Sequence, residues 1–465
     1  MVTTEEQSRQ IMIVQAKPKT KATIALLKPL AVTWFCPRRL MENPGEKLKE
    51  NEREKQGKEV YHHYAHADLC KDTRWTAKEC YAYMYARSWR PVNQFYSDLV
   101  NGKSVLSELF GAKNEGNIVE SLDEYAPETS QPEDQSGRWA RATFKIVVSY
   151  HGEYFDGWQK QPGLNTVQGL IERSIGTFVD DKKAQHLKDK GLPVEGMTAV
   201  AGRTDKGVTA LNQVCSFYTW RKDVKVEDVE CAINMAAPGK LRVVSVSQVS
   251  RAFHPNFCAK WRRYLYMFPL GEDNQLKQID KQEKKNICFD MSRERHRKNT
   301  AEDNRVEETE GFPHGRDVID GAKKPTSFSV AKVDLFLRNL EGKLLSYKMF
   351  ARDTKASRNI GPPTECFLYH ARATEAMLPC SSKSEADAVR VMCVELVGNR
   401  FLRRMVRVLV ATAVREAAAG SEDGILLKLV EATCRRATAP PAPPDGLCLV
   451  DVGYSDFNPR RCFIY

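Results

Sequence analysis

A short charged loop between two apolar runs constrains the fold of this chain more than any other sequence feature. One run ends at Val200 and the next covers residues 214–218, and both have the composition of β-strands. Gly202 and Gly207 bracket the loop, and glycine adopts the backbone angles of tight turns at the least steric cost. The sequence therefore predicts a strand–loop–strand unit at the edge of a sheet.

Three successive residues of this loop, Arg203, Thr204 and Asp205, are candidates for a functional site. A plain hairpin needs only small or turn-forming residues, so a run of Arg, Thr and Asp indicates an additional role. From the residues alone, an Asx-type turn with an exposed ion pair between Arg203 and Asp205 is the alternative.

The rest of the chain from residue 143 onward predicts alternating strands and helices. Strand-like alternation with one buried face occurs at residues 143–150, and further strands are predicted at 241–249 and 389–397. Thr166 is a suitable N-cap for a helix, and residues 226–236 and 333–344 carry amphipathic stripes. A long helix is predicted from Gly398 to about Ala418, on which Arg400, Arg404 and Arg407 would share one face. The pattern predicts a mixed α and β fold.

Composition limits the class of protein. A chain of 465 residues exceeds a single core of ordinary size, which favours two lobes or domains with linkers. The net charge of +11 permits a nucleic-acid or anionic partner. Thirteen cysteines without a close C-x-x-C pair indicate reduced thiols in an intracellular protein and not a disulfide framework. No uncharged apolar run approaches the ~18 residues of a membrane helix.

One group of potential metal ligands precedes the predicted strands. On a helix, His62, His66 and Cys70 would share a face, with Cys80 beyond them. Structural zinc sites usually have paired short ligand spacings, which this group lacks. A packed helical region is therefore favoured over a zinc site, and no metal is predicted.

Signature motifs in the chain resemble those of the TruA family of tRNA pseudouridine synthases. The loop at residues 202–208, Gly-Arg-Thr-Asp-Lys-Gly-Val, resembles the family's first signature, in the form typical of eukaryotic members. Arg262-Arg263-Tyr264-x-Tyr266 resembles the second signature, and Asn399-x-Phe401-x-x-x-Met405-Val406-Arg407 resembles the third. Gly157-Trp158-Gln159 resembles the opening of the catalytic domain and Gly446-Leu447 its closing strand. The motifs occur in family order.

The resemblance implies a role for each site residue. Asp205 is the expected nucleophile, Arg407 forms an ion pair that keeps Asp205 ionised, and Tyr264 stacks on the target base. Arg203 is expected to help displace the uridine from the RNA stack, and Leu447 to pack against the extruded base. Lys206 and Arg404 are further substrate-binding candidates.

The resemblance also implies a fold and a function. The expected fold is α+β and two-lobed, a mostly antiparallel sheet flanked by helices with a central RNA-binding cleft. The expected activity is isomerisation of uridine to pseudouridine in tRNA, in the anticodon arm, without a cofactor. Thr209 stands where many bacterial members have histidine, so the identity of the modified uridine stays open, as does attack of Asp205 on the sugar or the base. The expected partners are tRNA and, as in the bacterial enzymes, a second copy of the chain, with no membrane.

Changes in composition divide the chain into six predicted segments. They are a basic and charged N-terminal extension (1–60), a small helical accessory region (61–112), an acidic linker (113–138), the N-terminal lobe with the Asp loop (139–270), a charged insertion (271–329) and the C-terminal lobe (330–465). The extension resembles an organellar transit segment, with a disordered basic arm as the alternative. Localisation to an organelle or to the nucleus or cytoplasm stays open.

Two other functions remain as alternatives. The first is a non-catalytic RNA-binding protein or RNA chaperone on the same fold, against which the intact Asp205, Tyr264 and Arg407 argue. The second is an unrelated Asp-dependent hydrolase, which is disfavoured because no second carboxylate stands at a readable spacing from Asp205.

Overall fold

The computed structural model describes residues 66–110, 141–271, 324–352, 363–379 and 389–465, all of which belong to one compact unit. The predicted N-terminal extension, the acidic linker and most of the charged insertion lie outside the described residues. Within the described ranges, no helix is long and apolar enough to cross a membrane. Every cysteine in these ranges is a free thiol, as predicted.

A nine-stranded sheet forms the centre of this unit. The strand order is β4-β1-β3-β9-β5-β8-β7-β6, with β2 beside β3. All pairs are antiparallel except β3 and β9. The strands are β1 (Ala142–Tyr150), β2 (Thr198–Val200), β3 (Thr209–Thr219), β4 (Leu241–Val249), β5 (Trp261–Pro269), β6 (Leu344–Ser346), β7 (Glu365–Met377), β8 (Arg390–Gly398) and β9 (Leu447–Gly453). The predicted fold class, a mostly antiparallel sheet flanked by helices, is confirmed.

The described helices are α1 (Ala77–Tyr85), α2 (Arg90–Val100), α3 (Val167–Ser174), α4 (Asp181–Asp189), α5 (Val226–Asn234), α7 (Val330–Arg338), α8 (Met405–Ala419) and α9 (Ile425–Val430). Short 3₁₀ turns join several of them. Thr166 caps α3 as predicted, because its side chain accepts a hydrogen bond from the backbone N–H of Gly169.

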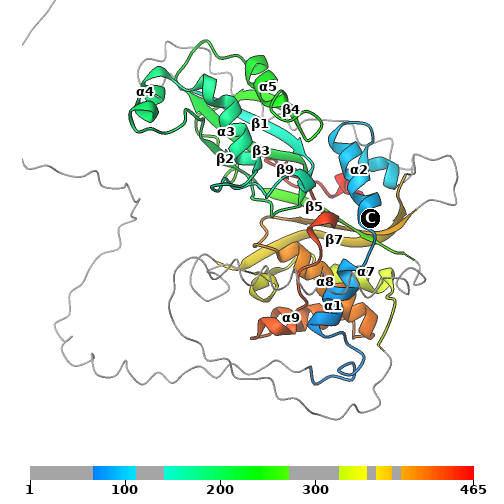
Figure 1. Cartoon of the computed structure of the whole chain (residues 1–465). Helices are drawn as coiled ribbons and strands as arrows, with labels where there is room; N and C mark the ends of the chain where they lie inside the picture. Colours follow the sequence, from blue (N-terminus) through cyan, green and yellow to red (C-terminus); the bar gives the residue numbers. More distant parts are fainter. Residues whose placement is uncertain (1–65, 111–140, 272–323, 353–362, 380–388) are drawn as a thin grey trace, which may run out of the picture. The chain divides into compact units, whose positions relative to one another are not determined.

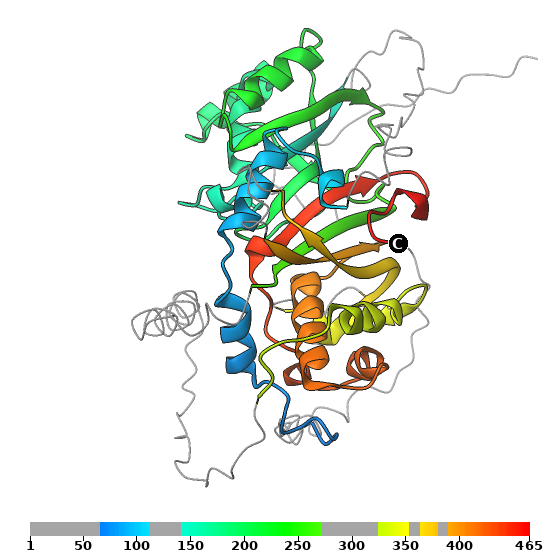
Figure 2. The ribbon, with the colours of Figure 1, turned by 90° about the vertical axis from the view of Figure 1, so that its right-hand side faces the viewer.

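Helices cover both faces of the sheet (Figures 1 and 2). Successive residues of a strand point to opposite faces, and along β9 Leu447 and Leu449 belong to two clusters on one face, whereas Cys448 and Val450 belong to a cluster on the other. On the first face, α3 and α5 cover β1, β3 and β4, and α7, α8 and α9 cover β5, β7 and β8. On the second face α2 packs against β5 and β9. Two separate hydrophobic cores therefore share one face of a continuous sheet.

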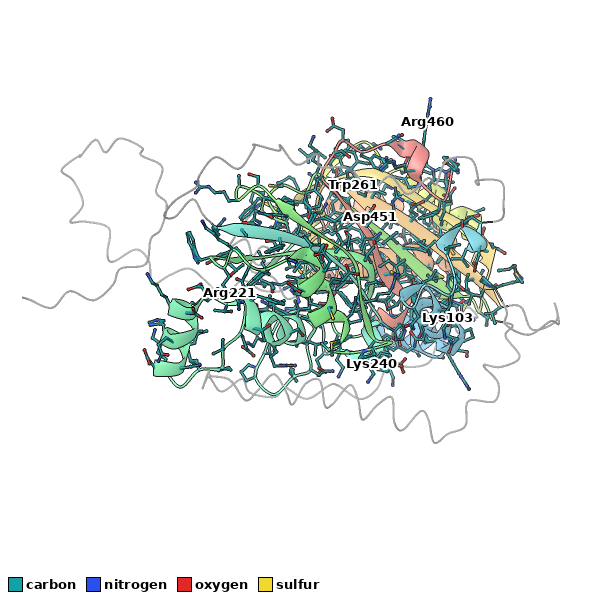
Figure 3. All side chains as sticks on the ribbon, turned by 90° about the horizontal axis from the view of Figure 1, so that it is seen from above. Lys103, Arg221, Lys240, Trp261, Asp451 and Arg460 are labelled. Carbon is teal, nitrogen blue, oxygen red and sulfur yellow. The ribbon has the colours of Figure 1, made fainter. Side chains whose placement is uncertain are left out.

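Side chains fill the space around the central strands. Figure 3 shows Trp261 and Asp451, which lie on the neighbouring strands β5 and β9, among densely packed side chains, whereas Arg460 and Lys103 project outward.

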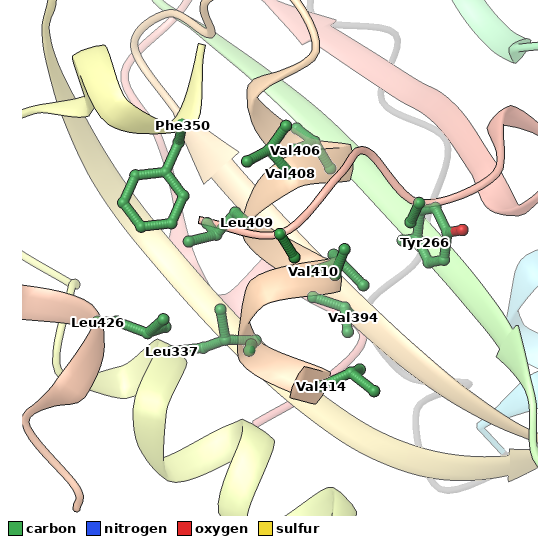
Figure 4. Packing of buried hydrophobic residues seen from close by; sticks show 14 of the residues in the cluster. Tyr266, Leu337, Phe350, Val394, Val406, Val408, Leu409, Val410, Val414 and Leu426 are labelled. Carbon is green, nitrogen blue, oxygen red and sulfur yellow. The ribbon is translucent and has the colours of Figure 1, made fainter. Parts of the chain in front are cut away.

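The helix α8 lies at the centre of the larger core (Figure 4). Val408, Leu409 and Val410 are fully buried, as is Val414 one turn later, so apolar residues surround the helix. Phe350, which comes from a 3₁₀ turn after β6, packs beside the same helix. Because full burial of such a side chain stabilises by about 1.5–3 kcal/mol, the helix is rigidly held and can position residues at its N-terminus.

The helices of the predicted accessory region pack into the two cores. Cys80 and Met84 of α1 lie in the α8 core, and Arg74 before α1 pairs with buried Glu416 at 2.8 Å. On the other face, the Tyr96 hydroxyl of α2 donates to the carbonyl of Gly446 at 2.8 Å. The helices α1 and α2 therefore pack into the same hydrophobic cores as the strands of the central sheet.

Four predictions of local structure need correction, and for two of them the element is confirmed and only its bounds differ. The helix predicted from Gly398 begins at Met405, since Arg404 adopts a φ of +60° that a helix cannot contain. Arg400, Arg404 and Arg407 therefore do not share a helix face. The strand predicted at 214–218 begins at Thr209, and the helix predicted at 333–344 covers Val330–Arg338.

The fourth concerns β1, where alternation predicted one buried face. Val147 and Ser149 are buried along with the alternating apolar residues. The strand has neighbours on both sides, β3 and β4, and only two of its residues keep intermediate exposure.

Candidate active site

The Asp loop, residues 201–208, connects β2 to β3 and is fixed by hydrogen bonds from its surroundings. The Thr204 hydroxyl lies 2.7 Å from the Tyr150 hydroxyl, and both are buried. The Thr204 carbonyl accepts from the Trp158 N–H at 3.1 Å. The Gln213 amide donates to the Gly202 carbonyl at 2.7 Å. These bonds hold Thr204 inward and leave the next residue, Asp205, partly exposed.

A glycine of the predicted opening motif makes close approach to this loop possible. Gly157 has a φ of +101°, and a Cβ there would lie 3.1 Å from the Lys206 nitrogen and the Thr204 oxygen. A side chain at this position would therefore be strained and would push against the loop. The motif Gly157-Trp158 acts as a support under the Asp loop.

Three guanidinium groups surround the Asp205 carboxylate. Arg407 Nη1 lies 3.4 Å from Oδ2, Arg404 Nε lies 4.0 Å from the same oxygen, and Arg403 Nε lies 3.8 Å from Oδ1. The alternative ion pair between Asp205 and Arg203 is not formed in the described residues, where Arg203 is exposed. Three positively charged groups from one segment therefore face this carboxylate.

Arg407 is the most constrained of the three arginines. Its side chain is 8% exposed, compared with 28% for Arg404 and 52% for Arg403. It lies in the first turn of α8, and its Nε donates to the carbonyl of Ala442 at 2.6 Å. The Arg407 carbonyl in turn accepts from the Ala442 N–H. The guanidinium is thus held from behind while Nη1 faces Asp205.

Sequence reasoning missed Arg403, although it named its neighbour Arg404. The prediction of a continuous helix placed Arg403 off the basic face. The left-handed backbone at Arg404 instead lets both side chains reach the same carboxylate. The available signal in the sequence was the pair Arg403-Arg404, which directly precedes the helix that carries Arg407 in its first turn.

Tyr264 lies on β5, where both cores meet. It packs against the cluster that holds α8 and against the cluster that holds α3. Its ring meets the ring of Phe401 edge-on, with centroids 5.0 Å apart. Burial, opposed by Arg262 and reinforced by the negative Asp205, raises the pKa of Tyr264 to about 12. The phenol is therefore neutral at physiological pH, and an aromatic face is available beside the carboxylate.

The parallel pair of strands brings Leu447 to the same place. Thr209 pairs with Cys448, so β3 and β9 begin side by side, and the residues that precede or start them, Val208 and Leu447, share one cluster with Tyr264. Leu447 is 7% exposed. Leu447 at the start of β9 therefore shares a cluster with Tyr264 within the adjacent strand β5 and with Val208 of the Asp loop.

The remaining candidates, Arg203 and Lys206, are exposed on the Asp loop. Lys206 Nζ lies 2.9 Å from Asp156 Oδ1, so this lysine connects the loop to the segment that supports it. The arrangement can present positive charge to an anionic ligand around one carboxylate.

A second polar cluster lies on the other face of the sheet. Donor atoms of His370, Glu395 and Cys462 lie within 4.8 Å of one another. The Glu395 carboxylate accepts the N–H groups of Phe463 and Ile464, and Arg263 Nε lies 3.5 Å from its other oxygen. With these partners the carboxylate attaches the C-terminal segment to the sheet.

The predicted helical face of His66 and Cys70 is absent from the described residues. Both lie in irregular or turn structure before α1, and Cys80 is buried in the α8 core. His62 lies outside the described residues. The spacing that made these residues zinc candidates therefore does not put His66 and Cys70 on one helix.

Comparison with known proteins gives a family match for the C-terminal part of the chain. Residues 353–455 match the family model described as tRNA pseudouridine synthase. This range contains the three arginines and Leu447, but not Asp205 or Tyr264.

Individual relatives extend the match. The tRNA pseudouridine synthase A of Solibacter usitatus (strain Ellin6076) is 37% identical over 122 residues, which are 26% of this chain and 45% of the relative. The proteins of the same name from Geobacillus sp. (strain WCH70) and Acetivibrio thermocellus are 26% and 25% identical over 67% of this chain and 98% of each relative. The chain thus spans less than half the length of the first relative and nearly all of the other two.

Proposed function

We propose that the chain is a tRNA pseudouridine synthase of the TruA type, which isomerises uridine to pseudouridine in tRNA with Asp205 as the nucleophile; the family match of residues 353–455 and the similarity to tRNA pseudouridine synthase A proteins support this proposal. The reaction breaks the bond between C1′ and N1 of the uridine, rotates the uracil and joins C5 to C1′. N1 gains a proton and C5 loses one, so no electrons are transferred to or from a cofactor. A positioned carboxylate that bonds covalently to the substrate is sufficient for such a route.

The observation that carries this proposal is the meeting of Asp205 with Arg407. The two residues are 202 positions apart, one on the loop before β3 and the other in the first turn of α8, yet Nη1 lies 3.4 Å from the carboxylate. A carboxylate fixed beside a buried guanidinium is in position for attack on C1′ or on the uracil ring.

The other site residues have proposed roles in holding the base. Tyr264 stacks on the extruded uracil, and Leu447 covers it from the next strand. Arg203, exposed on the Asp loop, fills the place that the base leaves in the RNA stack. Lys206, Arg403 and Arg404 contact phosphates, which strengthens binding without reading sequence.

The proposed substrate is the anticodon arm of tRNA, and the proposed assembly is a homodimer. The proposed domain division assigns residues 139–270 and 330–465 to the two lobes of the catalytic domain. It assigns 1–60 to an N-terminal extension, 61–112 to the accessory region, 113–138 to an acidic linker and 271–329 to a charged insertion. Mapping pseudouridines in RNA from cells that lack the protein identifies the substrate, and tRNA positions outside the anticodon arm would contradict this part of the proposal.

The activity is tested with tRNA that carries tritium at C5 of uracil. The wild-type chain is expected to release tritium and Asp205→Ala to release none above background. Asp156→Asn is a matched control, because it removes a carboxylate that pairs with Lys206 beside the same loop and leaves Asp205 in place. Tight tRNA binding without tritium release from the wild type would favour the alternative of a non-catalytic RNA-binding protein or chaperone.

A further inference from the structure

A single buried arginine on β5 connects three segments that border the site. Arg262 Nη2 donates to the carbonyl of Ala201 at 3.0 Å, at the start of the Asp loop. Nη1 donates to the carbonyl of Asn399 at 2.8 Å, in the segment that leads to Arg403 and Arg404. Nη2 also donates to the backbone and side-chain oxygens of Asn256, at 3.1 and 2.7 Å.

We propose that Arg262 is a positioning residue for the reaction: its guanidinium sets the separation between the Asp205 carboxylate and the arginines that surround it. This inference rests on the proposed function.

The chemistry of the contacts supports a geometric role. Among the described residues, all hydrogen-bond acceptors of the Arg262 side chain are uncharged carbonyl or amide oxygens. The residue is 8% exposed. Burial of a cation without a carboxylate partner costs stability, and it lowers the pKa of the guanidinium below its usual value. A planar guanidinium spreads five donors over three nitrogens and can bond oxygens on opposite sides at once, whereas the three donors of a lysine radiate from one nitrogen.

Two of the three connected segments are also anchored to strands of the sheet. The Asn399 side chain accepts the Phe367 N–H of β7 at 3.0 Å, and the Ala201 N–H donates to Val214 of β3 at 2.9 Å. Arg262 therefore links two parts of the site through its hydrogen bonds. One part is the Asp loop beside β3, and the other is the arginine-rich segment beside β7 and β8. Loss of the guanidinium would release one side relative to the other.

The position of Arg262 on its strand places the frame beside the base-stacking residue. Arg262 and Tyr264 are two residues apart on β5, so they point to the same face of the sheet. Arg263, between them, points to the opposite face, where it lies 3.5 Å from Glu395. Both arginines are buried, but only Arg262 bonds the loops of the site. Arg263 is therefore a matched control for Arg262.

The test compares Arg262→Met, Arg262→Lys and Arg263→Met in single-turnover tritium release at saturating tRNA. At a temperature where all variants are folded, Arg262→Met is expected to lower the rate constant roughly 100-fold, because a displacement of about 1 Å at the reacting groups costs that much. Arg262→Lys, which can bond one or two of the acceptors, is expected to recover part of the rate. The tRNA dissociation constant should change less than about 3-fold, since Arg262 is buried away from solvent.

Arg263→Met is expected to lower the melting temperature because Glu395 loses a charged neighbour, but to keep the wild-type single-turnover rate. An Arg262→Met rate equal to that of wild type would overturn the inference while the proposed function stands. Equal rate losses in Arg262→Met and Arg263→Met would assign Arg262 a purely structural role and also overturn it. A wild-type chain that releases no tritium would overturn the proposed function, and this inference with it.

Discussion

The two loops that meet at the site are built in opposite ways. In the Asp loop, glycines take the unusual backbone angles, Gly207 within it and Gly157 beneath it, and the functional residue Asp205 is not among the positive-φ residues. In the arginine loop, residues 398–404, Arg404 itself has a φ of +60°, the one positive φ of a non-glycine in the part of the chain that the structure describes. In the Asp loop, the residue with the functional side chain, Asp205, does not have a strained backbone. In the arginine loop, the strained residue, Arg404, is itself a functional residue.

This difference shows where each loop obtains its shape. Thr204 and Gly202 of the Asp loop are held by local hydrogen bonds from Tyr150, Trp158 and Gln213. The left-handed geometry at Arg404 costs roughly 1–2 kcal/mol and has no side-chain cap, so the packing of α8 behind it must supply the compensation. We therefore expect substitutions in the two loops to separate catalysis from stability.

The largest effect is expected at Arg407, the residue through which the rigid helix reaches the Asp loop. Arg407→Met removes the closest cation to Asp205 and is expected to lower the single-turnover rate roughly 10²–10³-fold, the range for loss of one fixed electrostatic group. Arg403→Met, which removes a half-exposed cation from the same carboxylate, should cost less than about 10-fold, because solvent screens exposed pairs.

Tritium release by both variants under saturating tRNA measures this contrast. Arg407→Lys serves as the control that keeps a positive charge on the helix. An Arg403→Met loss as large as that of Arg407→Met would mean that anchoring by α8 does not distinguish the arginines.

A smaller effect is expected at Tyr264, which stands between the two loops. Tyr264→Leu should lower the rate roughly 5- to 150-fold, because stacking on a base contributes about 1–3 kcal/mol. Tyr264→Phe keeps the ring and should stay within a few-fold of wild type. Since burial raises the pKa of Tyr264 to about 12, its hydroxyl stays protonated through neutral pH. Wild type and Tyr264→Phe should therefore have the same pH–rate profile between about pH 6 and 10, and a limb present only in the wild type would assign the hydroxyl a role in proton transfer.

How far the sequence predicts the molecule differs between the same two loops. Strand alternation and paired glycines located β1, β4 and the Asp loop, because those signals are local. The arginine spacing at 400, 404 and 407 fits a helix face, but the backbone is left-handed at Arg404 and the helix begins only at Met405. The contact of Tyr96 with Gly446 joins residues 350 positions apart, and no local pattern could indicate it. The meeting of Asp205 with Arg407 was expected from the family motifs and not from spacing.

A side chain introduced beneath the Asp loop tests its local support. Gly157→Ala should destabilise the fold by about 2–3 kcal/mol, because the φ of +101° is strained for alanine and its Cβ would press on Lys206 and Thr204. Gly163→Ala is the matched control: its φ is +72°, with nothing within 4 Å of the new Cβ, so only about 1 kcal/mol of backbone strain is expected. Chemical denaturation measures both, and tritium release should fall for Gly157→Ala alone. Equal activity of the two variants would show that the loop does not depend on close support.

Introducing a glycine at Arg404 is expected to have the smallest effect on stability. It relieves backbone strain, whereas Gly157→Ala introduces it. Arg404→Gly and Arg404→Ala both remove a guanidinium that lies 4.0 Å from Asp205, so they should weaken tRNA binding equally. Glycine accepts a φ of +60° without strain, whereas alanine retains it, so Arg404→Gly should be the more stable of the two by about 1 kcal/mol in chemical denaturation. This gain exceeds the entropy that glycine adds to the unfolded chain only if the left-handed geometry persists after the arginine is gone. Equal stability of the two variants would mean that the backbone relaxes once the side chain is removed, and that attraction to Asp205, not packing of α8, maintains the turn.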